Sequence, residues 1–207
     1  MRKWIGAICV FLGVICLLGA MGFVVYNRWE DKNAEKIAQD ILENVQSMIE
    51  TTQPELPLPE DTVVPPEDTE QIPLEMATVK VDGYDCIGVL SIPVLSMKLP
   101  ILTEWSYEKL KNAPCHYYGT YYEKDFVIAG HNYESHFGKI SLLQAGDVVI
   151  FTDVNGVDHC YEVVLLETLP REATLEMITS GFDLSLYTCT PDATARTTVR
   201  CSFIPGA

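Results

Sequence analysis

The segment 185–204, SLYTCTPDATARTTVRCSFI, combines a cysteine with two arginines at a spacing that could support nucleophilic catalysis. Side chains alternate between the two faces of a strand, so Leu184 and Leu186 share one face and Cys189 lies on the other. A nearby guanidinium favours the thiolate and can also stabilise the oxyanion that forms when a thiolate attacks a carbonyl. The segment therefore predicts Cys189 as a nucleophile.

The choice of arginine follows from the turn that separates two strands. Residues TPDATA have turn chemistry, and the sequence RTTVRCSFI after them has the alternation of a return strand. In such a hairpin Arg196 begins the second strand where Cys189 ends the first, so the two are cross-strand neighbours. Arg200 would lie about 13 Å further along, at about 3.3 Å per residue. We therefore predict Arg196 as the oxyanion-stabilising residue, with Arg200 as the second choice.

A proton carrier must come from another part of the chain. Of the four histidines, His131 follows directly on the apolar run FVIAG. A strand that ends in Gly-His places an imidazole at the rim of a sheet, and Gly130 allows close backbone approach. His131 is therefore the predicted general acid and base, although a histidine in a loop is often simply solvated.

The remaining cysteines allow several interpretations. Cys9 and Cys16 fall in an apolar segment, which leaves an odd number of thiols outside it and therefore at least one free. The others can be buried or joined in disulfides: Cys86, Cys115, Cys160 and Cys201. No C-x-x-C pair indicates zinc, and we expect no metal or organic cofactor. A structural disulfide between Cys189 and Cys201 would instead indicate a non-catalytic domain.

The amino terminus predicts a membrane anchor. Residues 5–26 carry no charged side chain, and about 20 apolar residues suffice to cross a bilayer as a helix. Arg2 and Lys3 precede this run, so residues 1–4 are expected in the cytosol and the rest outside, as a single-pass type II protein. A cleaved signal peptide is the alternative. The net charge of -15 and the lack of a basic patch argue against nucleic acid as a partner.

Three further regions follow the anchor. Residues 27–50 have apolar side chains four apart and predict an amphipathic juxtamembrane helix that packs on the following domain or on a second copy. Residues 51–77 are rich in proline and carboxylates, which predicts an extended linker that holds the domain away from the membrane. Residues 78–207 form the predicted catalytic domain.

Residues 78–207 have the sequence pattern of a β-protein. Short apolar runs broken by Gly, Pro and Asn predict a mainly antiparallel sheet, closed as a barrel or packed as a sandwich. Only residues 104–113 and 138–145 look helical, and both are too short to cover a parallel sheet.

Taken together, these segments resemble the sortases, the membrane-anchored cysteine transpeptidases of Gram-positive bacteria. VIAGHNYESHFGKI resembles the family's histidine segment, LSLYTC its nucleophile segment, and Arg196 falls where the family arginine follows on the next strand. IGVLSIP followed by KLPIL is similar to the paired first strands of the family barrel. The histidine segment is nearest to class B, but the class B insertion before the nucleophile is absent, so the resemblance implies no subclass.

The resemblance implies an eight-stranded sortase β-barrel and a thiol-protease type of chemistry. Cys189 would attack the Thr carbonyl of an LPXTG-like sorting signal, His131 would transfer protons, and Arg196 would stabilise the oxyanion. The implied partners are surface proteins or pilins that carry the signal, and an amine acceptor such as lipid II or a pilin lysine. Some sortases bind calcium, but Glu167, Glu172 and Glu176 do not form a recognisable site. The alternatives are another cell-wall cysteine peptidase, an L,D-transpeptidase, or a non-catalytic anchored β-domain.

Overall fold

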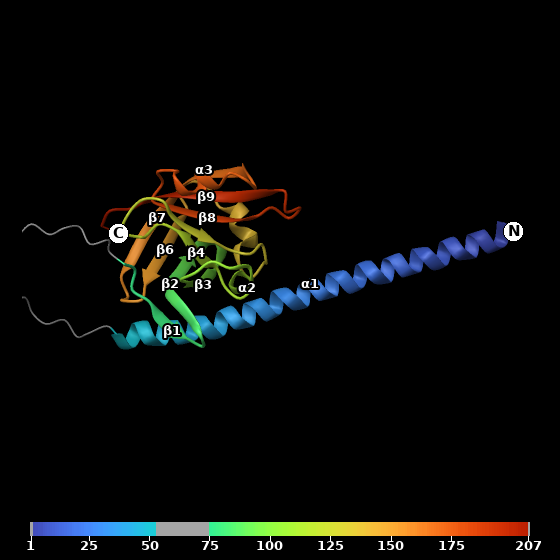
Figure 1. Ribbon diagram of the computed structural model, residues 1–207, viewed down its shortest axis with the longest axis horizontal. Helices are drawn as coiled ribbons and strands as arrows, with labels where there is room; N and C mark the ends of the chain where they lie inside the picture. Colours follow the sequence, from blue (N-terminus) through green and yellow to red (C-terminus); the bar gives the residue numbers. More distant parts are fainter. Residues whose placement is uncertain (1, 53–74, 207) are drawn as a thin grey trace, which may run out of the picture.

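The structure is a computed structural model that describes residues 2–52 and 75–206. It consists of one long helix and a β-barrel (Figure 1). The long helix is α1 (Arg2–Thr52). The strands are β1 (Val79–Val81), β2 (Tyr84–Ile92), β3 (Met97–Leu102), β4 (Cys115–Tyr118), β5 (Phe126–Ala129), β6 (Val148–Asp153), β7 (Asp158–Pro170), β8 (Leu184–Cys189) and β9 (Ala195–Phe203). The short helices are η1 (Pro93–Leu95), α2 (Tyr107–Leu110), η2 (Phe137–Leu142) and α3 (Thr174–Ile178).

Eight of these strands close into a ring. Their order is β2-β3-β4-β5-β8-β9-β7-β6, and β6 pairs back onto β2. Strand β1 extends the sheet only as a hairpin partner of β2. The pairs β3–β4 and β5–β8 are parallel and the others antiparallel. The predicted closed eight-stranded barrel is confirmed, and the sandwich alternative is excluded.

Closure depends on a glycine in β2, the strand that pairs with both β3 and β6. The register between β2 and β3 shifts between Cys86 and Gly88, and Gly88 has φ +156. A Cβ at this position would lie 2.2 Å from the Thr152 carbonyl oxygen. Only glycine lets the two backbones approach so closely, so the bulge bends β2 toward its second partner.

The barrel interior confirms the alternation read from the last two strands. Leu184 and Leu186 of β8 are fully buried, together with Val199 and Cys201 of β9. Cys201 is therefore the buried thiol on the core side. Phe203, two residues further on, is 45% exposed because β9 extends there past its pairing with β8, and its ring packs edge-on against Tyr161.

The helical predictions were only partly right. Of residues 104–113 only Tyr107–Leu110 form an α-helix, which Ser106 caps by accepting the Lys109 N–H. Of residues 138–145 the first part joins the 3-10 helix η2, Phe137–Leu142. Helix α3 was missed, because five residues between two strands are too few to show a periodicity.

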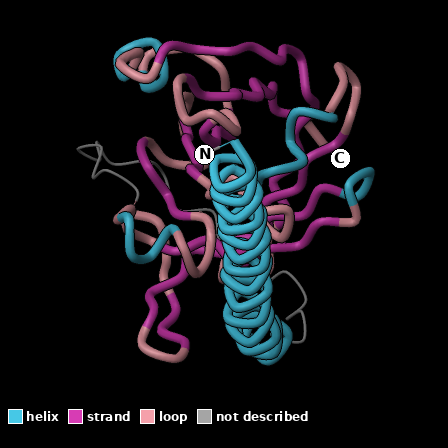
Figure 2. The backbone as a smooth tube through the Cα atoms, turned by 90° about the vertical axis from the view of Figure 1, so that its right-hand side faces the viewer, coloured by secondary structure: helices cyan, strands magenta, loops and turns pink. Residues whose placement is uncertain are grey.

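Helix α1 runs without a break from the apolar segment onto the barrel. Its first half projects away from the barrel (Figure 1), with exposed apolar side chains from Val10 to Tyr26, and is long and apolar enough to cross a membrane. Its second half packs against the first strands; Figure 2 shows the strands behind the helix when it is viewed nearly end-on. The amphipathic helix predicted over residues 27–50 is thus continuous with the apolar segment.

The packed face of α1 completes part of the core. Ile41, Leu42 and Val45 are at most 4% exposed and lie in one cluster with Val89 and Leu102 of the barrel. Of the two alternatives for the amphipathic stripe, packing on the domain is the one observed. The stripe is apolar because it faces the barrel, so the helix is part of the folded unit.

The predicted proline-rich linker, residues 51–77, falls largely outside the described residues. Its expected role as a spacer therefore stays a prediction. Helix α1 itself connects the apolar segment to the barrel, since its second half packs against the first strands.

Candidate active site

His131 and Cys189 are brought together by two neighbouring parallel strands. In the β5–β8 pair Ala129 lies opposite Tyr187, and the next residue, Gly130, donates its N–H to the Tyr187 carbonyl oxygen at 3.0 Å. His131 and Cys189 each stand two residues beyond this pair. Since parallel strands end at the same edge of a sheet, the two residues stand level at one edge of the barrel.

The next strand brings the arginine to the same edge. Cys189 lies directly opposite Arg196 in the antiparallel β8–β9 register, as predicted. The turn between them is held by Thr190, whose Oγ1 donates to Asp192 at 2.6 Å and accepts the Ala195 N–H at 3.1 Å. Cys189 is exposed and its thiol is free. The three predicted residues therefore come from three adjacent strand ends.

Arg196 is held by an aromatic ring and keeps a donor available. Its guanidinium carbon lies 5.1 Å from the ring centroid of Tyr187, which is buried and packs edge-on against Tyr117. Such a cation–π contact orients the guanidinium without using its N–H groups. Nη1 of Arg196 is buried and has no hydrogen-bond partner among the described residues. This N–H group is therefore a donor that no acceptor in the described part of the chain uses.

Arg200, the second choice, lies elsewhere and its donors are occupied. It pairs with Ser185, four residues before Cys189, and is only 2% exposed. Nε donates to the Glu167 carboxylate at 2.7 Å and Nη1 to Ser185 Oγ at 2.8 Å. Nη2 donates to the Glu176 carbonyl oxygen at 2.9 Å. Arg200 therefore fastens α3 and β7 to β8, and Arg196 is the arginine available for chemistry.

We expect Arg200→Met to lower the free energy of unfolding by about 3 kcal/mol, because it leaves buried partners of a hydrogen-bonded cation unsatisfied. The matched control is Arg196→Met, which removes a cation–π contact worth about 1 kcal/mol. Urea denaturation of residues 27–207, followed by tryptophan fluorescence, measures both. Equal losses of stability in the two variants would contradict this division of roles.

The histidine loop, residues 131–138, is closed by its own backbone. Phe137 donates its N–H to the His131 carbonyl oxygen at 3.0 Å, and Gly138 donates to that of Tyr133 at 2.8 Å. A Cβ at Gly130 would lie 2.3 Å from the buried ring of Phe137, which explains the glycine before His131. The predicted close approach at Gly130 is thus packing against an aromatic ring of the same loop.

The His131 imidazole is partly buried and stacked. Its ring lies 3.8 Å from that of Tyr133, with 19° between the planes. Burial lowers the pKa of His131 below its ordinary value, and the nearby carboxylate of Glu30 acts in the opposite direction. The imidazole is therefore mainly neutral at pH 7, in the form that accepts a proton.

His136, at the other end of the loop, is fully buried. Its two ring nitrogens have no hydrogen-bond partner among the described residues. Burial lowers its pKa to about 4, with a smaller contribution from His131 and an opposing one from Asp31. The neutral ring is thus a structural part of the loop.

This histidine predicts a loss of stability in acid. Its folded pKa lies below its unfolded value, so the unfolded chain binds the extra proton and stability falls as the pH drops from about 6.5 toward 4. We expect a loss of about 2 to 3 kcal/mol from this group by pH 4.5. Urea denaturation of residues 27–207 at pH 7 and 4.5 tests it: the acid loss should shrink in His136→Leu but not in the exposed-loop control Glu134→Gln. An unchanged acid loss in His136→Leu would contradict the prediction.

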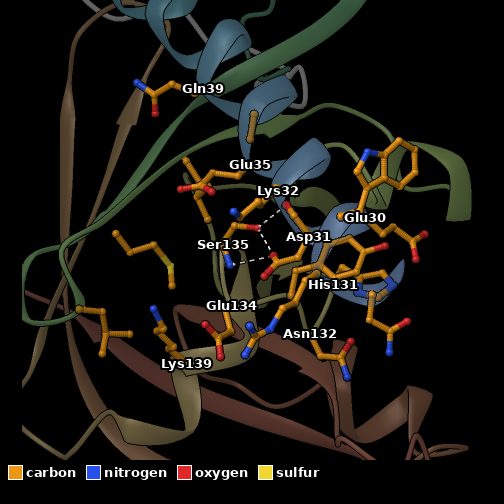
Figure 3. A pocket seen from close by; sticks show the side chains of 18 of the residues that line it. Glu30, Asp31, Lys32, Glu35, Gln39, His131, Asn132, Glu134, Ser135 and Lys139 are labelled. Carbon is orange, nitrogen blue, oxygen red and sulfur yellow. Dashed lines mark hydrogen bonds between the residues drawn. The ribbon is translucent and has the colours of Figure 1, made fainter. Parts of the chain in front are cut away.

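A cleft of about 1160 Å³ opens beside the histidine loop (Figure 3). The loop and residues 95–99 form two of its walls, and a third is α1, from which Glu30, Asp31 and Glu35 line the cleft. Of the three predicted residues only His131 lines this cleft, and the contact of α1 with the histidine loop was not predicted. No local pattern could have predicted it, because the contact joins residues about a hundred positions apart.

The other cysteines and the glutamates considered for calcium form neither a disulfide nor a metal site in the described part of the chain. The described cysteines from Cys16 onward are free thiols, so Cys189 and Cys201 are not a disulfide. Glu167 is engaged by Arg200, and within residues 2–52 and 75–206 no group of three or more His, Cys, Asp or Glu side chains is arranged to hold a metal ion.

Comparison with known proteins agrees with this architecture. The sortase domain family matches residues 90–204. Sortase C1 from Streptococcus agalactiae has a similar structure, with a TM-score of 0.54 and 26% identity over 62% of this chain and 72% of that one. Sortase C1 from Streptococcus suis gives 0.52 and 26%, over 59% and 74%.

A Clostridium perfringens sortase D5 transpeptidase is similar over more of the chain. Its TM-score is 0.59, over 82% of this chain and 99% of that one, and at 19% identity this likeness concerns the fold. No protein of curated function matches the sequence significantly. The family match covers more than half of the chain and ends one residue after β9, so it includes all three strand ends of the site. The chain therefore belongs to the sortase family.

Proposed function

We propose that this sortase is a cysteine transpeptidase in which Cys189 is the nucleophile, His131 the proton carrier and Arg196 the oxyanion donor. The observation that carries the proposal is the Cys189–Arg196 cross-strand pair with an unused, buried guanidinium donor. His131 supports it by standing level with Cys189 at the end of the adjoining parallel strand. Membership of the family supports the reaction class.

The first half of the reaction forms a thioacyl enzyme. The thiolate of Cys189 attacks the Thr carbonyl carbon of an LPXTG-like signal, and the carbonyl oxygen becomes an oxyanion that accepts from Arg196. The tetrahedral species then collapses and the C–N bond breaks. Protonated His131 donates its proton to the leaving amine, which departs as a neutral group.

The second half transfers the acyl group. Neutral His131 takes a proton from the incoming amine, whose nitrogen attacks the thioacyl carbon. A C–N bond forms, the C–S bond breaks and Cys189 leaves as the thiolate. Water in place of the amine would make the same site a cysteine endopeptidase, which is the slower alternative.

The partners and the location follow from the family and from α1. The proposed substrates are surface proteins or pilins with a carboxyl-terminal sorting signal, and the proposed acceptors are amines of lipid II or a pilin lysine. The apolar half of α1 supports a membrane anchor. We propose a single-pass type II orientation with residues 1–4 in the cytosol, the anchor over residues 5–26 and the catalytic domain of residues 78–207 outside the cell.

The test uses the full chain in detergent micelles with a panel of LPXTG-like peptides and an amine acceptor such as hydroxylamine. Mass spectrometry should show an acyl adduct on Cys189, and the acceptor should release it as an amide-type product. Absence of any adduct on Cys189 across the panel would refute the proposed mechanism. Release only by water would favour the endopeptidase alternative.

A further inference from the structure

Helix α1 is hydrogen-bonded to the histidine loop. Asp31 Oδ1 accepts from Ser135 twice, from Oγ at 2.5 Å and from the backbone N–H at 3.2 Å (Figure 3). The Ser135 hydroxyl also lies 3.4 Å from the Asp31 carbonyl oxygen. The two residues are 104 positions apart, so this contact ties the loop to a distant part of the chain, helix α1.

Ser135 is placed to transmit this contact to His131. Two backbone hydrogen bonds close the loop around it: Phe137 donates its N–H to the His131 carbonyl oxygen, and Gly138 donates to that of Tyr133. Besides these backbone bonds the loop contains only the first two residues of η2, and no strand or α-helix. Charge-assisted hydrogen bonds to a fixed helix therefore restrict where the stacked His131–Tyr133 pair can lie.

Glu30, the preceding residue of α1, lines the same cleft as the stacked His131–Tyr133 pair. Its side chain is 28% exposed, and one carboxylate oxygen lies 3.9 Å from Lys111 Nζ. Both Glu30 and Asp31 favour the protonated form of His131, whereas Lys111 and burial disfavour it. Glu30 also favours the neutral phenol of Tyr133, which raises the pKa of that group together with burial.

We propose that Glu30 and Asp31 are positioning residues of the transfer reaction, Asp31 by holding the histidine loop through Ser135 and Glu30 by stabilising protonated His131. The proposal rests on the proposed function, in which His131 alternates between two protonation states. Burial alone would keep the ring neutral, and a neutral ring cannot donate a proton to the leaving amine. The Glu30 carboxylate reduces that penalty at the step that needs the imidazolium.

The charge role is tested without activity. In the full chain in micelles, labelled with ¹³C at histidine and assigned with His131→Gln, the titration of His131 is followed by NMR. Glu30→Gln should move its midpoint to lower pH, because removal of a neighbouring negative charge destabilises the imidazolium. Asp40→Asn, an exposed carboxylate change on the same helix, is the control and should leave the midpoint in place.

The loop role is tested by transfer kinetics on the same material. Asp31→Ala should lower kcat by about 10- to 100-fold with little change in the KM for the peptide, because the general acid is displaced while Cys189 and Arg196, on other strands, stay in place. Asp31→Asn should restore most of kcat, since its amide oxygen can accept both Ser135 hydrogen bonds. In Glu30→Gln, the part of the pH–kcat profile that follows the His131 titration should move to lower pH by the same amount as the NMR midpoint.

The outcomes separate the two proposals. A wild-type His131 titration in Glu30→Gln together with wild-type kcat in Asp31→Ala would overturn the inference and leave the transpeptidase proposal standing. A wild-type chain that forms no acyl adduct would overturn the transpeptidase proposal. In that case an unshifted His131 midpoint in Glu30→Gln would also overturn the charge role.

Discussion

Replacement of Cys189 by alanine should lower the rate of peptide transfer by at least about 10⁴-fold, because removal of the nucleophile from an enzyme of this type typically lowers kcat by this factor or more. Without Sγ no thioacyl intermediate can form. Arg196 would still be available to an oxyanion, so the residual reaction could only be direct attack by the acceptor or by water. Product formation measured by mass spectrometry on full-length chain in micelles gives the factor.

The control for this substitution is Cys160→Ala, which removes another free and partly exposed thiol, on β7. It should keep wild-type transfer and wild-type adduct formation. Cys189→Ser tests the thiol more finely: the hydroxyl keeps the shape but is a much weaker nucleophile at neutral pH. Transfer within tenfold of wild type in Cys189→Ala would show that a different residue attacks the substrate.

Removal of residues 1–76 should leave the barrel unable to fold stably, whereas removal of residues 1–26 should not. The shorter deletion keeps the packed half of α1. The longer one removes Ile41, Leu42 and Val45, each buried in the barrel-side cluster. Three such side chains contribute roughly 5 to 8 kcal/mol by burial, before the cost of ordering the helix. This is comparable to the whole stability of a typical domain, about 5 to 15 kcal/mol.

Urea denaturation and gel filtration of residues 27–207 and 77–207 measure this difference. Chain 27–207 should be monomeric and cooperative, and chain 77–207 should aggregate or unfold at low urea because it exposes Val89 and Leu102. A pair of substitutions within 27–207 isolates the contact: Val45→Asp should reproduce the loss, and Ser47→Asp, on the exposed side of the helix, should not. Equal urea midpoints for the two shortened chains would show that the barrel folds without α1.

What the sequence could predict depends on how local each feature is. The Cys189–Arg196 pair is separated by one turn, so strand alternation and turn chemistry suffice to predict its register. The neighbourhood of His131 and Cys189 requires the parallel β5–β8 pair, which no local pattern encodes. The nearness of His131 and Cys189 was therefore expected only from the resemblance to the sortases.

Other features were beyond local patterns altogether. The stripe on residues 27–50 predicted that an apolar face must be covered, but not that the first strands of the barrel cover it. Asp31 is a polar residue on a helix with no sequence signal, and only the docked position of α1 brings it to Ser135. Helix α3 escaped detection because it is shorter than two turns.

The unbroken course of α1 has a consequence for where the reaction takes place. At about 1.5 Å per residue, Glu30 lies only about 6 Å along the helix axis beyond Tyr26, the end of the apolar segment. With that segment in a bilayer, the catalytic edge stands at a fixed height in the headgroup region and cannot swing away on a tether. Substrates and acceptors that are themselves lipid-anchored then meet the enzyme by lateral diffusion in two dimensions, in a layer whose depth the helix sets.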